Sequence, residues 1–307
     1  MNDLLKKYLF ADRSLRIQTA NLQQTWQDAR QHQKHPKVIE KLLGELCAAS
    51  VLLASNIKFD GSLLLQIQGD GPIALLVVEC GSDLRLRATV KLRQEFAIKE
   101  NATFQELVNP NRSGRFVVIL DLKDRQEGQQ AYQGIVDLHG NSVAEVLDNY
   151  MRSSEQLETH IRLAADDNKA TGILLQRLAA SGGITIDKEK AAENWEKAGH
   201  FIQTVTPEEQ LKLSEDELVH RLFWEDELLK TEEDQAIQWY CSCSREKVAD
   251  MLRMLGIAEV ESILEERGEV DVSCDYCGKP YHFDAIQCAQ LFIDKDKLSA
   301  QESPTAH

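Results

Sequence analysis

The chain has 307 residues, of which 43% are hydrophobic, and carries 35 Lys and Arg against 50 Asp and Glu, for a net charge of -15. This length suggests about two domains, each large enough to bury a core. Because polyanions are held by Lys and Arg side chains, the acidic balance disfavours DNA or RNA as the main partner.

The negative charge is concentrated in the last two fifths of the sequence. Residues 1–186 carry 22 acidic and 22 basic side chains. Residues 187–234 carry 15 acidic and 6 basic side chains, and residues 241–294 carry 11 and 5. This change of composition predicts a domain boundary near Gly182 and Gly183.

Targeting and membrane signals are not apparent in the sequence. Residues 1–7 lack the apolar core of a signal peptide, and no run of about 18 apolar residues is long enough to span a bilayer. We therefore expect a cytoplasmic protein without a membrane partner. In a reducing cytosol, seven cysteines indicate metal or redox chemistry rather than a static disulfide framework.

The first block alternates a few helices with many strands. Apolar residues at helical spacing predict a helix over 38–57, with Cys47 on its buried face as a small core side chain. A hairpin is expected over 62–80, a capping box at Ser142 predicts a helix to about Leu157, and further strands are predicted at 84–90, 116–122, 132–138, 159–165 and 171–178. This order favours an α+β fold with a mainly antiparallel sheet over a doubly wound one.

Catalytic signatures are missing from this block. Gly69-x-Gly71 lacks the third glycine and the helix of a dinucleotide fingerprint, so we interpret it as a turn. We find no nucleophile elbow and no Walker-type loop, and we expect the protein not to be an enzyme.

The second block, residues 187–234, is predicted to form short helices with few apolar residues. Thr206 with Glu209 and Ser214 with Glu217 are two capping boxes. Short helices need support from their neighbours, because isolated helices below about 12–15 residues are marginal in water. The block is either an ordinary solvated connector or a segment that melts when its support is lost.

Four of the seven cysteines form two close pairs, Cys241 with Cys243 and Cys274 with Cys277, separated by 30 residues. Zinc takes four tetrahedral thiolates, and short-spaced pairs allow one turn to supply two ligands. We therefore predict a site with four thiolates and one Zn²⁺, which leaves no open position for catalysis. The alternatives are four unrelated free cysteines, or His282 or Cys288 in place of one thiolate.

The sequence around these cysteines predicts two helices, a hairpin and a final helix. The helices are expected at 244–255 and 258–266, the second strand of the hairpin at 281–283, and the last helix after its cap, Asp284. A module of about 54 residues has a marginal core, so removal of the metal should unfold it. Each pair is also close enough in sequence to form its own disulfide, and oxidation would then eject zinc.

At this point the sequence resembles the redox-regulated thirty-three-kilodalton heat-shock chaperone family of bacteria. The resemblance extends over nearly the whole chain, and the segments that carry it are Cys241-Ser-Cys243-Ser-Arg-Glu246, Glu265-Glu-Arg-Gly-Glu-Val270, Cys274-Asp-Tyr-Cys277-Gly278 and Tyr150-Met-Arg-Ser-Ser-Glu-Gln156. The motif residues Cys241, Cys243, Cys274 and Cys277 are present in full. Cys47, Cys80 and Cys288 lie outside it and inherit no role.

The resemblance implies a domain order and a mechanism. It implies an α+β domain over 1–182 for dimerisation and client binding, an acidic helical linker over 183–240, a zinc domain over 241–294 and a disordered tail over 295–307. It implies a holdase that works without ATP and is inactive while reduced and zinc-bound. Oxidants and heat are then expected to form a disulfide in each cysteine pair, release zinc, unfold the linker and promote homodimers that hold unfolding clients.

Two other functions fit parts of the pattern. A thiol-disulfide oxidoreductase would use Cys274-x-x-Cys277, although this pair lacks the strand-to-helix start that lowers a thiol pKa in thioredoxin-like proteins. A zinc-ribbon nucleic-acid module would need a basic face, whereas residues 241–294 are acidic. In the chaperone interpretation, we expect repulsion among the acids of 187–234 to favour opening.

Overall fold

The computed structural model describes residues 3–124, 131–179 and 187–293. The chain forms two compact units, Met1–Tyr240 and Cys241–His307, which we describe separately. The predicted boundary at Gly182 and Gly183 and the predicted tail over 295–307 lie outside the described residues. The separation of a domain over 1–182 from a linker over 183–240 stays a prediction.

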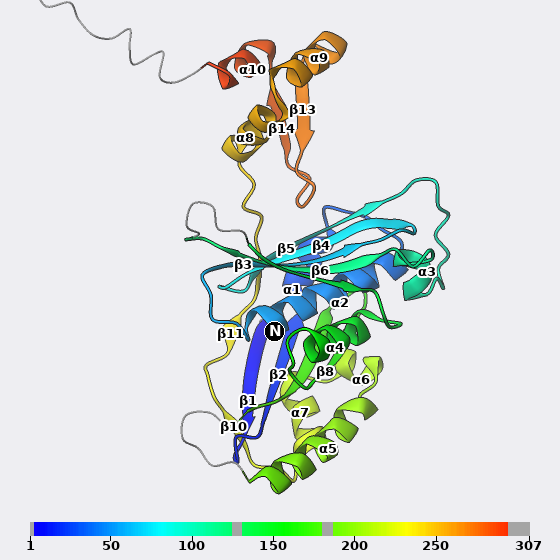
Figure 1. Cartoon of the computed structure of the whole chain (residues 1–307), viewed down its shortest axis with the longest axis vertical. Coiled ribbons are helices and arrows are strands. Elements are labelled where there is room, and N and C mark those ends of the chain that lie inside the picture. The colour runs from blue at the N-terminus through cyan, green and yellow to red at the C-terminus, as the bar shows by residue number, and fades with distance from the viewer. Residues whose placement is uncertain (1–2, 125–130, 180–186, 294–307) are drawn as a thin grey trace, which may run out of the picture. The chain divides into compact units, whose positions relative to one another are not determined.

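The first unit contains two six-stranded sheets (Figure 1). The first sheet has the order β10-β1-β2-β9-β8, and β11 also pairs with β1. All its pairs are antiparallel, and its strands are β1 (Leu4–Phe10), β2 (Leu15–Leu22), β8 (Thr159–Ala165), β9 (Ala170–Arg177), β10 (Leu228–Lys230) and β11 (Gln235–Ala236). The predicted strands 159–165 and 171–178 are confirmed as β8 and β9, whereas β1 and β2 were not predicted.

The second sheet has the order β12-β5-β4-β3-β6-β7. Its strands are β3 (Gly61–Gln68), β4 (Ile73–Gly81), β5 (Arg85–Leu92), β6 (Arg115–Leu122), β7 (Tyr132–Asp137) and β12 (Gln238–Trp239). The predicted hairpin is confirmed as the antiparallel pair β3 and β4, and β12 with β5 is the one parallel pair among the described strands. The α+β fold with mainly antiparallel sheets is therefore confirmed.

Helix α2 (Lys37–Ala54) lies between the two sheets and packs on both (Figure 1). It is buried along most of its length because apolar residues recur on all its sides, and Cys47 is 1% exposed within the core, as predicted. Close approach to the first sheet depends on Gly44, where a Cβ would lie 2.6 Å from the Cβ of Ala165. The helix ends at Ala54 rather than at residue 57.

Three other helices surround this core, α1 (Gln24–Arg30), α3 (Phe104–Val108) and α4 (Val143–Ser153). Ser142 caps α4 by accepting from Glu145 N, as predicted, but the Glu145 carboxylate accepts from Asn141 N instead of completing the box. The helix ends at Ser153, not at Leu157, and Gln156 then has a φ of 57°.

Helices α5 (Lys188–Thr204), α6 (Pro207–Lys212) and α7 (Glu215–Phe223) pack on the first sheet. Both predicted capping boxes are confirmed, at Thr206 and at Ser214. Ile202, Leu218 and Phe223 are buried in a cluster with Leu15 and Ile17 of β2. The expectation of a helical linker over 183–240 is wrong after Phe223, because β10 and β11 follow and pair with β1.

The second unit consists of α8 (Arg245–Leu255), α9 (Ile257–Arg267), β13 (Val270–Ser273), β14 (Pro280–Phe283) and α10 (Ala285–Leu291). The predicted order of two helices, a hairpin and a helix is confirmed. Ser244 and Asp284 cap α8 and α10, and Gly268 ends α9 in the left-handed conformation. Over the described residues 241–293 the core is small, with eight buried hydrophobic residues that include Phe283 and Leu252.

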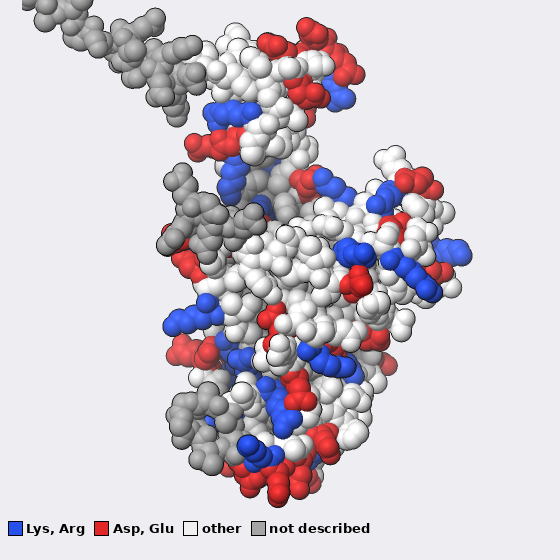
Figure 2. All heavy atoms as spheres, viewed as in Figure 1, with Lys and Arg blue, Asp and Glu red and all other residues white. Residues whose placement is uncertain are grey.

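Among the described residues, every helix is too short or too polar to cross a membrane. Figure 2 shows acidic side chains gathered at the end of the first unit that holds α5, and again over α9 of the second unit. The acidic excess found in the sequence therefore lies on exposed helical surfaces.

Candidate metal centre

The four motif cysteines come from two short segments without regular structure. Cys241 and Cys243 lie in the extended stretch between β12 and α8, and Cys274 and Cys277 lie in the turn between β13 and β14. This turn is closed by two backbone hydrogen bonds, from Gly278 N to Cys274 O at 2.8 Å and from Cys274 N to Lys279 O at 3.0 Å. Glycine is favoured at position 278 because its φ is 67°.

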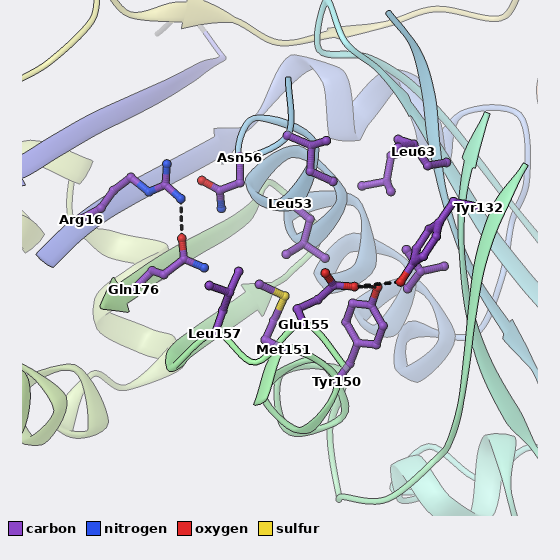
Figure 3. Close-up of a pocket in the computed structure, with 13 residues that line it drawn as sticks. Arg16, Leu53, Asn56, Leu63, Tyr132, Tyr150, Met151, Glu155, Leu157 and Gln176 are labelled. Atoms are coloured by element: carbon purple, nitrogen blue, oxygen red, sulfur yellow. Dashed lines mark hydrogen bonds between the residues drawn. The ribbon is translucent and has the colours of Figure 1, made fainter. Parts of the chain in front are cut away.

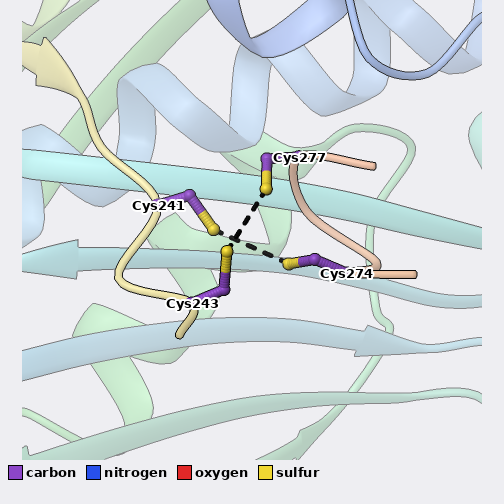
Figure 4. Close-up of side chains that lie close together, drawn as sticks. All are labelled: Cys241, Cys243, Cys274 and Cys277. Atoms are coloured by element: carbon purple, nitrogen blue, oxygen red, sulfur yellow. Dashed lines mark hydrogen bonds between the residues drawn. The ribbon is translucent and has the colours of Figure 1, made fainter. Parts of the chain in front are cut away.

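The four sulfur atoms converge on one point (Figure 4). All lie within 4.8 Å of one another, with 3.7 Å between the Sγ atoms of Cys241 and Cys274 and 3.4 Å between those of Cys243 and Cys277. A tetrahedral zinc ion bound to sulfur at about 2.3 Å requires sulfurs about 3.8 Å apart, whereas a disulfide requires about 2.05 Å. The four cysteines therefore have the spacing of a metal site and the donor set that zinc prefers.

Tyr281 of β14 contacts this cluster, although no motif in the sequence indicates that it does. Its hydroxyl lies 3.0 Å from the Sγ atom of Cys243 and donates to it, while its ring is buried in the core of the second unit. In the sequence, Tyr281 was recognised only as a strand residue. Strand alternation places it on the same buried face as Phe283, and this was the available signal that it points inward.

The thiols differ in acidity. Burial raises the pKa of Cys243, but hydrogen bonds from Tyr281 and the neighbouring thiols outweigh burial and lower this pKa to about 7. Burial is the largest of the causes that raise the pKa of Cys277 to about 12, and it also raises the pKa of Cys241. Since its pKa is lowered, Cys243 is the most readily deprotonated of these three thiols. The thiolate is both the form that binds a metal and the reactive form of cysteine.

The two alternative ligands are engaged elsewhere. His282 points to two exposed carboxylates, with Nδ1 2.9 Å from Asp271 and Nε2 3.4 Å from Glu269. This pairing raises the pKa of His282, with the Asp271 hydrogen bond as the largest cause. Cys288 is 1% exposed inside the core of the second unit. Neither residue belongs to the cluster of four sulfurs.

The remaining two cysteines lie in the first unit. Cys47 and Cys80 are both buried, with 1% and 0% of their surface exposed. Burial raises the pKa of both thiols, Cys80 to about 12. They are therefore inert core side chains in the folded unit.

Zinc sites made of four cysteines are typical of structural rather than catalytic centres. Four thiolates complete the coordination of zinc and leave no position for water or substrate. The fold and the site together define a protein with a large α+β unit and a small unit whose four clustered cysteines could bind a metal ion.

Comparisons with known proteins agree with this description. Residues 3–284 match the family model described as "Hsp33 protein". The chain is 41% identical to the 33 kDa chaperonin of Methylobacillus flagellatus, over 95% of each chain, and 40% identical to that of Chromobacterium violaceum, over 97% of this chain and 96% of the other. Its fold is similar to that in the crystal structure of the Thermotoga maritima 33 kDa chaperonin, with a TM-score of 0.78 over 97% of this chain and all of the other, at 21% identity.

The chain therefore belongs to the Hsp33 family, a family of chaperones. The resemblance stated from the cysteine motif is confirmed.

Proposed function

We propose that this protein is an ATP-independent holdase that is inactive while reduced and is switched on by oxidation of its cysteine cluster. The observation that carries the proposal is the convergence of four sulfur atoms in a unit whose own core is small. In the reduced state, Cys241, Cys243, Cys274 and Cys277 would hold one Zn²⁺. The bound ion contributes folding free energy that a unit of this size lacks.

Oxidation of the four thiolates to two disulfides would remove the ligands of the zinc ion. Each pair of zinc-bound thiolates would lose two electrons to form one disulfide. One hydrogen peroxide takes up these two electrons and two protons from solvent and becomes two waters, and Zn²⁺ leaves once its thiolates are gone. We expect Cys241 to pair with Cys243 and Cys274 with Cys277. The Sγ distances of 3.7 Å between Cys241 and Cys274 and 3.4 Å between Cys243 and Cys277 join the two segments and exceed the length of a disulfide, about 2.05 Å, so the cysteines have to move before the expected disulfides form.

The linker immediately precedes the cysteine cluster along the chain. Cys241 comes two residues after Trp239, the last residue of β12, and β10, β11 and β12 are only two or three residues long. Such short strands are held by few hydrogen bonds, so we expect them to detach when the unit that follows them unfolds. Helices α5 to α7, which precede these strands, then lose their anchor at one end.

Release of the linker exposes apolar surface on the first sheet. Helices α5 and α7 cover Phe10, Leu15 and Ile17 on one side of β1 and β2, and Ile173 and Leu175 on β9. Contiguous exposed apolar surface is what a holdase needs to bind unfolding proteins. We infer that this face binds clients and that the active form is a homodimer in the cytoplasm.

The position of the second cysteine pair favours a chaperone over a thiol-disulfide oxidoreductase. Cys274 and Cys277 lie in a hairpin turn, so no helix begins at this pair to stabilise a thiolate. An oxidoreductase would reduce insulin catalytically in the presence of a thiol reductant. We expect this protein to show no turnover in that assay.

The direct test is suppression of client aggregation. The reduced chain, the peroxide-treated chain and a variant with the four motif cysteines changed to Ser are mixed with a thermally unfolding client. We expect suppression by the oxidised chain and by the metal-free variant, and little by the reduced chain. If the oxidised, zinc-free protein left aggregation unchanged, the proposal would be wrong.

A further inference from the structure

A cavity of about 250 Å³ lies in the first unit, at the end of α2 between the two sheets (Figure 3). Its lining comes from both sheets, α2, α4 and the segment after α4. Most of the wall is apolar, with Leu53, Met151 and Leu157 in the middle and Leu63 and Val118 from the second sheet. No residue of 187–293 lines it, so it is separate from the linker and from the cysteine cluster.

One end of the cavity has polar atoms without partners. Arg16 of β2 donates from Nη2 to Gln176 Oε1, but its Nε atom is buried and has no hydrogen bond to any described residue. The same holds for both amide atoms of Asn56. A buried polar group without a partner costs about 1–3 kcal/mol, and more when it is charged. Figure 3 shows Arg16 and Asn56 at the same end of the cavity, away from the tyrosines.

The charge at this end is not balanced. Arg16 forms no ion pair with any carboxylate among the described residues, and Glu232, the acid that most favours its charge, is paired instead with Lys7. Burial lowers the pKa of Arg16, although the guanidinium stays protonated at neutral pH. A partly buried cation without a carboxylate partner is complementary to an anion that brings its own apolar body.

At the other end of the cavity, the polar groups already have hydrogen-bond partners, and one of these groups is the carboxylate of Glu155. Glu155 Oε1 accepts hydrogen bonds from the hydroxyls of Tyr132, at 3.1 Å, and Tyr150. Tyr132 is 54% exposed, so this end lies near the surface. A second anionic group on a ligand would be repelled by Glu155, which favours a ligand with one anionic end only.

We propose that this cavity binds a small amphipathic monocarboxylate, such as a medium-chain fatty acid. The carboxylate lies against Arg16 and Asn56, whose buried Nε and Nδ2 atoms turn toward the cavity to donate to it, and the chain packs along Leu53, Met151 and Leu157. The size fits, because an apolar cavity of about 150 Å³ takes up benzene. The inference does not rest on the redox switch.

Calorimetric titration of octanoate into the reduced full-length chain tests this site, with octan-1-ol as the uncharged ligand of equal length. We expect saturable binding of octanoate. Arg16→Gln should weaken octanoate by about tenfold or more and octan-1-ol by less than about twofold, because a hydrogen bond to a charged group is lost only with the acid. The matched control is Arg115→Gln on β6, whose guanidinium is paired with Asp137 at 3.1 Å outside the cavity.

A second variant covers the case in which Arg16→Gln does not fold. Asn56→Asp places a negative charge beside the carboxylate, and it should abolish octanoate binding while octan-1-ol still binds. Absence of octanoate binding to the wild-type chain, or equal octanoate affinity in wild type and Asn56→Asp, would overturn the site. Binding should be the same before and after peroxide treatment, and octanoate that bound only the oxidised chain would also overturn it.

Discussion

Tyr281 joins the core of the second unit to its cysteine cluster through one hydrogen bond to Cys243. Changing Tyr281 to Phe keeps the ring in the core and removes only this donor. Removal of a side chain that hydrogen-bonds to a metal ligand typically lowers metal affinity by about 10–100-fold. We therefore expect Tyr281→Phe to bind zinc about tenfold more weakly, measured by competition with a chromophoric chelator.

The control for Tyr281→Phe is a variant of the neighbouring residue, His282. His282→Ala removes an exposed side chain that pairs with Asp271 and Glu269. We expect zinc affinity within about twofold of the wild type, since we assign His282 no role as a ligand. A large loss of zinc from His282→Ala with none from Tyr281→Phe would contradict the assignment of the centre.

Asp148 of α4 gives the first unit a stability that depends on pH. Burial raises its pKa to about 7, against the opposing effects of Arg162 and Arg152, and its carboxylate accepts from Ile161 N at 2.9 Å. The folded state holds this proton between about pH 4 and pH 7 while the unfolded state releases it, so the contribution of Asp148 to stability falls as pH rises through that window.

Asp148→Asn retains the acceptor for Ile161 and removes the charge. We expect the variant to be more stable than the wild type by about 1 kcal/mol or more at pH 8, and by clearly less at pH 5. Urea unfolding of the reduced chain at both values measures this difference. A stability gain that was the same at pH 5 and pH 8 would show that the carboxylate does not titrate in this range.

At the scale of elements, Phe223 holds the last linker helix on the first sheet. It is 2% exposed, and its ring packs edge-on against Phe10 at 5.7 Å between centroids and against Phe201 at 6.4 Å. Truncation of a buried Phe to Ala costs about 3–5 kcal/mol. We expect Phe223→Ala to suppress client aggregation at lower peroxide or lower temperature than the wild type.

The neighbouring residue provides the control for this helix. Trp224 is 69% exposed at the end of α7, so Trp224→Ala removes a large aromatic side chain without opening the linker. We expect its activation to follow that of the wild type. Equal activation of Phe223→Ala and Trp224→Ala would indicate that docking of α7 does not restrain the chaperone.

The sequence patterns identified elements best where one face is buried and the other is exposed. The β3 and β4 hairpin and the helices of the second unit have clear periodicity or caps, and all were predicted. The α2 helix is buried on most sides and was predicted from its apolar residues at helical spacing, although its end was placed at residue 57. Strands β1 and β2 were missed because the first sheet is covered on both faces, by α2 and by α5 to α7. Polar residues such as Gln18 and Thr19 are then buried too, which removes the alternation.

At the scale of the whole molecule, the four cysteines were predictable because short spacing alone places each pair in one short segment. Tyr281 and the cavity beside Arg16 were not predicted, because each depends on the packing of segments far apart in the sequence.

The expectation that repulsion among the acids of 187–234 favours opening does not apply to one of these acids. Asp216 accepts from Lys6 Nζ at 2.7 Å and from Tyr8 Oη at 2.6 Å, and so ties α7 to β1 instead of favouring opening.

Other acids of the linker are exposed and available for repulsion. Glu193, Glu196 and Glu233 form no ion pair with the residues that the structure describes. Changing all three to Gln should slow activation by peroxide, measured as the rise of aggregation suppression with time. The control changes Glu95 and Glu100 in the charge-balanced part to Gln, and an activation rate that did not differ between the two variants would remove this role for the linker charge.

The central claim is that loss of the metal site releases the linker while the sheets of the first unit stay folded. Hydrogen exchange on the full chain, before and after peroxide with mild heat, tests it most directly when zinc is measured on the same samples. We predict release of about one zinc per chain, loss of protection over 188–223, and retained protection in β3, β4 and β6. Protection that persisted over 188–223 after zinc had been released would contradict the account.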